Sequence, residues 1–237
     1  MPVGLVGVVR LQQSRMNAPQ ETTKNQVLPV VVLATENTHK VEEMRAIFAA
    51  LGWPVRLLGL NQLGGAFIQP RETGSTFEEN AAIKATSYAQ QTGHACLADD
   101  SGLEIDALGG RPGVISSHYC TDGREAGMSR AERDAANNQR VLTELQGVDD
   151  ALRTARFVCV MAIATPGNEP SVLVRGTFDG RIGTPPRVPA GENGFGYDPL
   201  FLVAPAFKLT SAQLPREEKN RMSHRAAAAA AIVAATS

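Results

Sequence analysis

Two adjacent carboxylates stand where a short apolar run gives way to a glycine, in the sequence Asp99-Asp100-Ser101-Gly102. Residues 95–98 predict a short buried strand, which would place both aspartates at its end. Carboxylate oxygens in such a position suit a hard divalent cation. Because adjacent side chains of a strand point to opposite faces, we expect one aspartate to reach the site and the other to bind nearby backbone. A simple Asx turn would use the same residues.

The polar segment 35–40 is a candidate phosphate-binding loop. It follows an apolar run at 28–34, which predicts a buried strand, and it leads into residues 39–51, whose apolar periodicity predicts a helix. The start of a helix presents unpaired backbone N–H groups and the positive end of the helix dipole, which favour an anion. The segment has neither a P-loop nor a dinucleotide-binding fingerprint, so an ordinary capped surface helix is the alternative.

Residues 76–91 predict a second helix, and the capping-box spacing of Ser75 and Glu78 indicates its start. Its apolar stripe would face the core. Glu79 and Lys84 lie off that stripe within one arc of the helix, so a carboxylate and an ammonium group could face a common ligand. A solvated polar face would have the same pattern.

An aromatic residue flanked by two glycines, Phe195, ends the Gly- and Pro-rich stretch 181–197, which has no helical period. The flanking glycines leave the faces of the ring unobstructed, which suits stacking on a nucleotide base. A ring that fills the core is the alternative.

Strands and helices are mixed along the remaining chain, which predicts a mixed α/β (α+β) fold and excludes an all-α or all-β class. The pattern predicts further strands at 103–108, 157–164, 172–178 and 200–203, a helix at 129–146, and an Ala-rich helix that ends at Ala235. Asp179-Gly180 is expected to form a turn. Residues 11–26 are polar and aperiodic, so we expect residues 1–27 to be a disordered extension before one domain at 28–237, with Met16 as a candidate true start.

The composition excludes several classes of partner. Of 237 residues, 43% are apolar and 20% are charged, and 23 basic against 24 acidic side chains leave a formal net charge of -1. This balance argues against binding to nucleic acid or an anionic membrane, and no apolar run approaches the ~20 residues of a membrane span. The three cysteines form no CxxC pair, and their odd number argues against a disulfide framework, which predicts a reducing, cytoplasmic location.

Five segments, in this order, resemble the inosine/xanthosine triphosphate pyrophosphatase family, the non-canonical purine NTP pyrophosphatases. They are residues 34–43 (ATENTHKVEE), 76–85 (TFEENAAIKA), 98–113 (ADDSGLEIDALGGRPG), 194–201 (GFGYDPLF) and 216–225 (REEKNRMSHR). The resemblance covers about residue 28 to the end. It implies an elongated central mixed sheet with two lobes flanking a nucleotide-binding cleft, and it implies a homodimer.

The resemblance also implies roles for individual residues. The triphosphate would be held by Thr35, Glu36, Asn37, Thr38, His39 and Lys40, and its charge would be neutralised by Lys84. Mg²⁺ would be coordinated by Glu79 and Asp100, and Asp100 would also act as the general base. Substrate contacts would come from Ser101, the base would be surrounded by Phe195, Gly196, Tyr197 and Asp198, and further base and phosphate contacts would come from Lys219, His224 and Arg225.

Two positions depart from the family pattern. Glu36 stands where relatives have glycine, so we expect its carboxylate to point away from the phosphates and its backbone to need none of glycine's conformational freedom. His118 stands where relatives often have an arginine, so the contact made by that arginine is in question.

The implied reaction is hydrolysis of ITP, dITP or XTP to the nucleoside monophosphate and pyrophosphate. Selectivity would rest on purine C6, where inosine and xanthosine present a keto oxygen to donors such as Arg225 or His224, whereas adenosine presents an amino donor. GTP shares the keto oxygen, so its rejection would rest on the 2-amino group. The alternatives are a related pyrophosphatase for pyrimidine or other modified nucleotides, and a non-catalytic purine-nucleotide sensor.

Overall fold

The computed structural model describes residues 28–36 and 38–236, so the expected extension at 1–27, including Met16, lies outside the described residues. The described chain forms one mixed sheet from six strands, which are β1 (Val30–Leu33), β2 (Arg56–Gly59), β3 (Ala95–Ile105), β4 (Thr154–Ala164), β5 (Val172–Ile182) and β6 (Phe201–Val203). Its α-helices are α1 (Thr38–Ala50), α2 (Phe77–Thr92), α3 (Arg130–Glu144), α4 (Arg216–Met222) and α5 (His224–Thr236).

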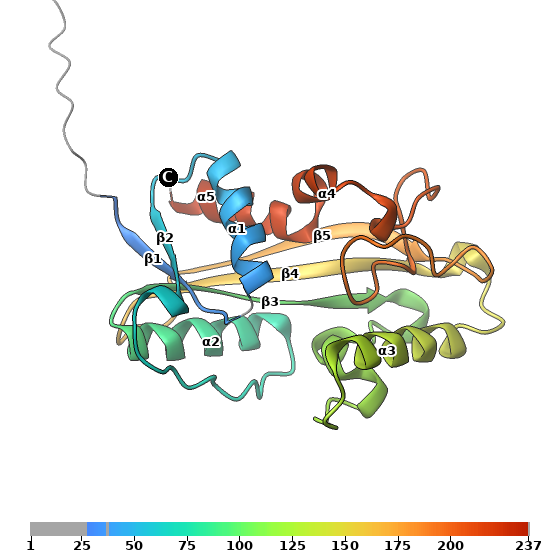
Figure 1. Ribbon diagram of the computed structural model, residues 1–237, viewed down its shortest axis with the longest axis horizontal. Helices are drawn as coiled ribbons and strands as arrows, with labels where there is room; N and C mark the ends of the chain where they lie inside the picture. The colour runs from blue at the N-terminus through green and yellow to red at the C-terminus, as the bar shows by residue number, and fades with distance from the viewer. Residues whose placement is uncertain (1–27, 37, 237) are drawn as a thin grey trace, which may run out of the picture.

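The strand order is β2-β1-β3-β4-β5-β6, with β1 parallel to β2 and β3 and the other neighbours antiparallel. The long strands β3, β4 and β5 run the length of the molecule, whereas β1 and β2 lie at one end (Figure 1). Helices α1, α4 and α5 cover one face of the sheet, and α2 and α3 cover the other (Figure 1). The expected elongated mixed sheet with two lobes is confirmed.

The central strands are buried on both faces because helices cover each of them. Leu97 and Met161 pack with α1 and α5 on one face, and Cys96, Ala98 and Val160 pack with α2 on the other. The apolar stripes that predicted the first two helices are therefore the surfaces that join these helices to the sheet. None of the helices in the described part of the chain is long and apolar enough to cross a bilayer.

The predicted break between the strands at 95–98 and 103–108 and the predicted turn at Asp179-Gly180 are both wrong, because β3 and β5 continue through them. Gly102 permits close packing instead of a turn, since a Cβ atom there would lie 2.4 Å from Ser116 Oγ. Gly180 serves the same purpose, since a Cβ atom there would lie 2.5 Å from the Phe201 ring. A glycine inside a strand pattern marks a close approach as readily as a turn.

Candidate active site

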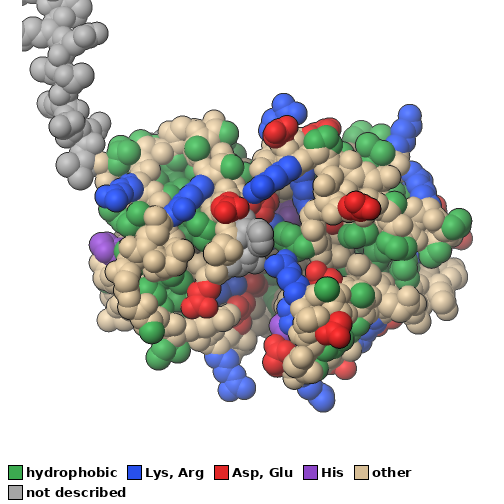
Figure 2. Space-filling model, viewed as in Figure 1, with side chains coloured by type: hydrophobic (Ala, Val, Ile, Leu, Met, Phe, Trp, Pro, Cys, Tyr) green, Lys and Arg blue, Asp and Glu red, His purple; other side chains and the backbone are tan. Residues whose placement is uncertain are grey.

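The long strand β3 has an open edge where β1 ends. β1 pairs with β3 only as far as Leu33 opposite Leu97, after which the chain leaves the sheet and enters α1. The next residues of β3 face a cleft, as is usual for ligand sites beyond the carboxyl ends of strands. Figure 2 shows a hollow between the two halves of the molecule with charged side chains of both signs around it. Two cavities lie here, and Ser117 lines both.

Asp99 is held by cations on the α1 and α5 face of the sheet. Its Oδ2 lies 2.7 Å from Lys40 Nζ and 3.8 Å from Arg225 Nε. Burial raises the pKa of Asp99, but the Lys40 and Arg225 charges outweigh burial and hold the pKa well below its ordinary value. The hydrogen-bond partners that the structure gives this carboxylate are side chains, where the sequence had predicted backbone. Asp99 is therefore a permanent anion that orients two cations of the site.

Asp100 points the other way, toward α2, as the alternation of a strand requires. Lys84 Nζ lies 2.8 Å from Asp100 Oδ1, and the two side chains are only 11% and 13% exposed. The second oxygen, Asp100 Oδ2, is buried without a hydrogen-bond partner among the described residues. Burial raises the pKa of the Asp100 carboxyl above its ordinary value, although Lys84 opposes this shift. A carboxylate with an unpaired oxygen and a raised pKa is suited to accept a proton.

Glu79, which the resemblance assigned to Mg²⁺, caps its own helix. The N-cap of α2 is Thr76, and its capping box is formed with Glu79, one residue later than the predicted pair Ser75 and Glu78. Glu79 Oε2 accepts hydrogen bonds from Ser75 N (2.6 Å), Ser75 Oγ (3.0 Å) and Thr76 N (3.3 Å). These bonds, led by the one from the Ser75 backbone, hold the pKa of Glu79 below its ordinary value. One oxygen of the carboxylate that the resemblance assigned to Mg²⁺ is therefore occupied by hydrogen bonds at the start of α2.

The carboxylate that the structure brings to Asp100 is Glu72, which the sequence analysis missed. Glu72 Oε2 lies 3.0 Å from the same Lys84 ammonium group. Glu72 and the unpartnered oxygen of Asp100 are donors of the type that Mg²⁺ prefers. No group of three metal-binding side chains occurs within the described residues. This donor set fits Mg²⁺, which is usually bound by one or two carboxylates with phosphate oxygens and water.

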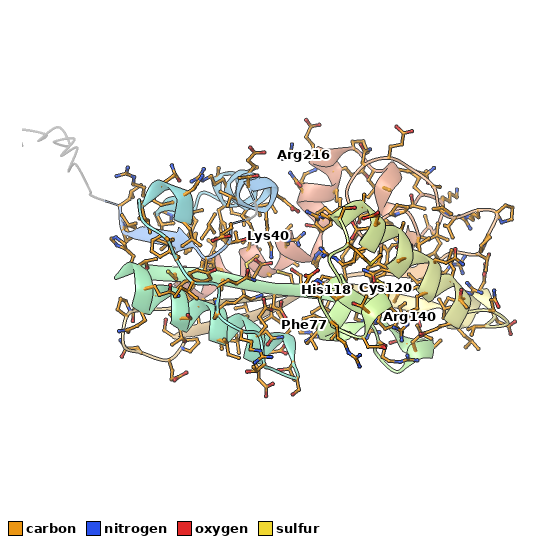
Figure 3. The ribbon with its side chains drawn as sticks, turned by 60° about the horizontal axis from the view of Figure 1, so that its bottom comes forward. Lys40, Phe77, His118, Cys120, Arg140 and Arg216 are labelled. Atoms are coloured by element: carbon orange, nitrogen blue, oxygen red, sulfur yellow. The ribbon has the colours of Figure 1, made fainter. Side chains whose placement is uncertain are left out.

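The loop before α1 reaches the cavity that contains Glu72 and Lys84. Thr35 and Lys40 line this cavity, which we call the phosphate cavity. Thr38 lines a neighbouring cavity on the other side of the loop. Asn37 and the side chain of His39 lie outside the described residues. In Figure 3, Lys40, which belongs to α1, lies over β3.

Glu36 also lines the phosphate cavity. The Glu36 backbone does not adopt the left-handed conformation that favours glycine, which confirms the expectation that a residue other than glycine fits here. Burial and then the Glu36 carboxylate raise the pKa of Tyr88, which lines the same cavity. The negative charge of Glu36 therefore acts inside the cavity, contrary to the expectation that it would point away.

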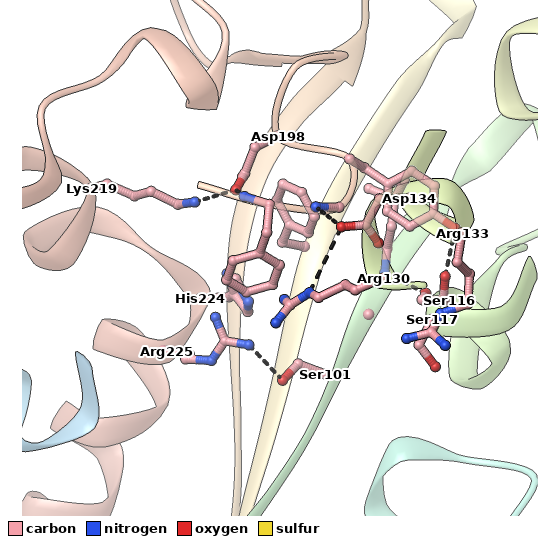
Figure 4. Close-up of a pocket in the computed structure, with 16 residues that line it drawn as sticks. Ser101, Ser116, Ser117, Arg130, Arg133, Asp134, Asp198, Lys219, His224 and Arg225 are labelled. Atoms are coloured by element: carbon pink, nitrogen blue, oxygen red, sulfur yellow. Dashed lines mark hydrogen bonds and ion pairs between the residues drawn. The ribbon is translucent and has the colours of Figure 1, made fainter. Parts of the chain in front are cut away.

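Phe195 lines the second cavity, which we call the base cavity. Figure 4 shows this cavity with its charged side chains labelled. The residue is 43% exposed, so the alternative of a ring that fills the core is wrong. The Arg130 guanidinium lies 4.5 Å from the ring centroid, and Lys219 and Arg225 lie 5.6 Å from it. An accessible ring surrounded by cationic groups is a suitable platform for a stacked base.

Asp198 fixes the loop that carries Phe195. Its Oδ2 accepts hydrogen bonds from Phe195 N (2.8 Å) and Lys219 Nζ (2.5 Å). Gly194 has a φ of +82°, and a Cβ atom there would lie 2.1 Å from the same oxygen. Tyr197 is buried and donates its hydroxyl to the Ser116 carbonyl oxygen at 2.7 Å, so it anchors the loop. The segment 194–198 thus presents one aromatic ring on a rigid backbone.

His224 and Arg225, at the start of α5, form one wall of the base cavity. His224 is buried, and its ring lies 5.2 Å from the ring of Phe157. Burial, together with the Arg225 and Lys219 charges, holds the pKa of His224 well below its ordinary value, so its imidazole is neutral at pH 7. Arg225 Nη2 donates to Ser101 Oγ at 3.3 Å, which brings the predicted substrate contact Ser101 to the same wall.

The opposite wall comes from α3, to which the sequence analysis gave no role. Arg130, Arg133 and Asp134 line the base cavity from the start of this helix. Asp134 Oδ2 accepts a hydrogen bond from Gly196 N at 3.0 Å, which joins the helix to the Phe195 loop. The cluster of arginines at residues 130–133 was the only signal in the sequence, and an exposed helix start has the same composition.

His118 lies near this wall but is engaged elsewhere. Its Nδ1 lies 2.8 Å from Ser117 Oγ and its Nε2 lies 3.1 Å from Glu125 Oε2. Figure 3 places His118 beside Cys120, at the end of the α3 lobe that faces the cleft. The residue does not line either cavity of the cleft in the described structure, so we assign it no contact with substrate.

A model of the Ham1 family matches residues 31–235. The chain belongs to the Ham1 family. Similar family members include the dITP/XTP pyrophosphatase of Nitratidesulfovibrio vulgaris, 49% identical over 198 residues, which are 82% of this chain and 89% of the relative. The dITP/XTP pyrophosphatase of Bacillus subtilis is 43% identical over 201 residues, which are 84% of this chain and 93% of that protein.

Solved structures of the Ham1 family have the same architecture. The HAM1 protein of Coxiella burnetii is 40% identical with a TM-score of 0.73, and the match covers 88% of this chain and 98% of that one. A nucleoside-triphosphatase / dITP/XTP pyrophosphatase from Mycobacterium abscessus is 40% identical with a TM-score of 0.65, over 86% of this chain and 98% of that one. The resemblance found in the sequence is therefore confirmed.

Proposed function

We propose that this Ham1 family member hydrolyses inosine and xanthosine triphosphates, including dITP, to the monophosphate and pyrophosphate. The observation that carries the proposal is that the two cavities adjoin at Ser117, which lines both. A cavity lined by Lys40 and Lys84 opens beside one that presents Phe195, and Asp100 lies in contact with Lys84. A triphosphate and its purine base need these two environments side by side. The names of the relatives favour a pyrophosphatase over a non-catalytic sensor.

Hydrolysis would begin with a water molecule held at Asp100. The unpartnered oxygen of Asp100 accepts its proton as the water oxygen attacks the α-phosphorus, and pyrophosphate leaves. Lys40 and Lys84 offset the roughly four negative charges that would otherwise repel the attacking oxygen. The Lys84 ammonium group also favours the ionised form of Asp100, because it opposes the rise in pKa that burial causes.

We also propose that Mg²⁺ is the cofactor, held by Asp100 and Glu72. When bound, the ion would neutralise phosphate charge and hold the triphosphate in line for attack. The support is that both carboxylates contact the same Lys84 ammonium group, Asp100 Oδ1 at 2.8 Å and Glu72 Oε2 at 3.0 Å. Glu79 is less suited, because its Oε2 already accepts hydrogen bonds at the start of α2.

The base would stack on Phe195 with its keto oxygen toward His224 and Arg225. Arg225 has no acceptor, so it favours an acceptor at C6 and opposes the amino group of adenine. Neutral His224 can donate one N–H to the same keto oxygen. Two further proposals rest on the sequence: a homodimer, which the resemblance implies, and a cytoplasmic location, which the odd cysteine count favours.

The test is pyrophosphate release from ITP, XTP, GTP and ATP, with and without Mg²⁺. We expect release from ITP and XTP to exceed release from ATP by orders of magnitude and to require the metal. Tight nucleotide binding without release would support the sensor, and preference for thymidine or uridine triphosphate would support the pyrimidine alternative.

A further inference from the structure

The base cavity carries more positive charge than a neutral base requires. Its lining includes four cationic side chains and two carboxylates, which are Arg130, Arg133, Lys219 and Arg225, with Asp134 and Asp198. Under the proposed function, the phosphate groups lie in the neighbouring cavity, which Lys40 and Lys84 line. The hypoxanthine base of ITP is neutral, so some of the charge has another purpose.

Three of the four cations have carboxylate neighbours. Lys219 Nζ lies 2.5 Å from Asp198, Arg225 Nη1 lies 3.5 Å from Glu43, and Arg130 Nε lies 3.9 Å from Asp134. These pairs reduce the positive charge that each cation presents to a ligand.

Arg133 is the exception. It forms no ion pair with any residue that the structure describes, and its Nε is buried without a hydrogen-bond partner. Figure 4 shows Arg133 beside Ser116 and Ser117, across the base cavity from His224 and Arg225. A shielded guanidinium N–H without a partner favours a ligand that brings an acceptor or a negative charge.

The six-membered ring of a purine presents C6, N1 and C2 in a row along one edge. If His224 and Arg225 bind the keto oxygen at C6, the C2 substituent lies toward the opposite wall. Xanthine carries an oxygen at C2 and loses a ring proton near neutral pH, which adds negative charge there. Hypoxanthine carries only hydrogen at C2, and guanine carries an amino donor.

We propose that Arg133 reads the purine C2 substituent and gives the site a preference for XTP over ITP and GTP. This inference rests on the proposed function and specifies its preferred substrate. A guanidinium group has five donors and no acceptor, so it would bind the xanthine oxygen and oppose the guanine amino group. It also explains how GTP, which shares the C6 oxygen, would be rejected.

The nearby acceptors are engaged in holding the wall together. Asp134 Oδ2 accepts from Gly196 N, and the Ser116 hydroxyl accepts from Leu103 N at 2.9 Å while it donates to a backbone carbonyl at 2.6 Å. Among the described residues of this wall, Arg133 therefore presents an unpaired polar group to the cavity.

The experiment compares kcat/KM for XTP, ITP and GTP in the full chain with saturating Mg²⁺. The variants are Arg133→Met, Arg133→Lys and the control Arg124→Met, which removes the same charge from an exposed position outside the cavities. In Arg133→Met, the ratio of XTP to ITP activity should fall roughly 10- to 100-fold, as expected for loss of a charge-assisted hydrogen bond. Arg133→Lys should restore part of the ratio, and Arg124→Met should leave it unchanged.

The pH dependence of the XTP to ITP activity ratio separates recognition of the base from a purely structural role of Arg133, because a structural role would not change this dependence. The XTP to ITP ratio of the wild-type protein should rise as pH increases through the ionisation of xanthine, and this rise should be smaller in Arg133→Met. If both substrates are hydrolysed and the ratio is the same in wild type and Arg133→Met, the role of Arg133 is wrong and the proposed function stands. If the wild-type protein releases pyrophosphate from neither, both proposals fail. Should Arg133→Met not fold, Arg133→Lys carries the same comparison with a smaller expected fall.

Discussion

Replacing Lys84 with methionine removes an ammonium group that contacts two carboxylates on the α2 side of the cleft, Asp100 and Glu72. The Asp100 side chain is only 13% exposed, and the substitution removes the ammonium group that lies 2.8 Å from its Oδ1. Breaking a buried ion pair by removing one partner costs about 3–5 kcal/mol. Asp100 can reduce this penalty by taking up a proton, because its pKa already lies above the ordinary value. We therefore expect the lower limit, a loss of about 3 kcal/mol in the free energy of unfolding at neutral pH.

The assay is thermal and urea unfolding followed by circular dichroism. For a domain of this size, ~3 kcal/mol corresponds to a fall of about 6–12 °C in Tm. The fall should depend on pH with a definite sign. A carboxyl group whose folded pKa is raised destabilises the fold when it is ionised, so the deficit is largest above that pKa and shrinks as pH falls through it.

Two comparisons isolate the contribution of the Lys84–Asp100 ion pair to stability. In an Asp100→Asn background, Lys84→Met should cost only about 1 kcal/mol, because no buried charge is left unpaired. Lys208→Met removes a charge from an exposed position and should change stability by less than about 0.5 kcal/mol. A fall in Tm that is the same in both backgrounds, or independent of pH, would refute the reasoning.

Three further predictions concern the reaction itself. Asp100→Asn should lose about 10³-fold or more in kcat while it still binds nucleotide and folds, and near-normal turnover would overturn the assignment of the base. Phe195→Ala should raise KM about 10-fold for every purine triphosphate, because a stacking platform is lost; an unchanged KM would exclude base stacking. Glu72→Gln should raise the Mg²⁺ concentration needed for half-maximal activity about 10-fold, whereas Glu79→Gln should not; the reverse order would return the metal to the residue that the resemblance indicated.

The sequence predicted most of the elements because their patterns are local. The apolar stripe of the helix that became α2, and the Ser129 and Glu132 cap of α3, depend only on residues within a few positions of each other. The errors arose at glycines. In the sequence, Gly102 and Gly180 resemble turn residues. In the structure, each position needs glycine because a side chain from a distant segment occupies the space of a Cβ atom.

The sequence by itself determined the family, the mixed fold and the chemical types present at the site. Asp100, Lys40 and Phe195 were all identified from local motifs. Only the tertiary structure decided which groups meet. β1 ends at Leu33 and leaves the edge of β3 open, so long side chains from other segments can contact β3 across the cleft. That geometry brings Asp100 and Glu72 to the same Lys84 ammonium group and places Glu79 at the cap of α2. It also brings α3 to the base cavity, a contact between segments about 60 residues apart that no local pattern encodes.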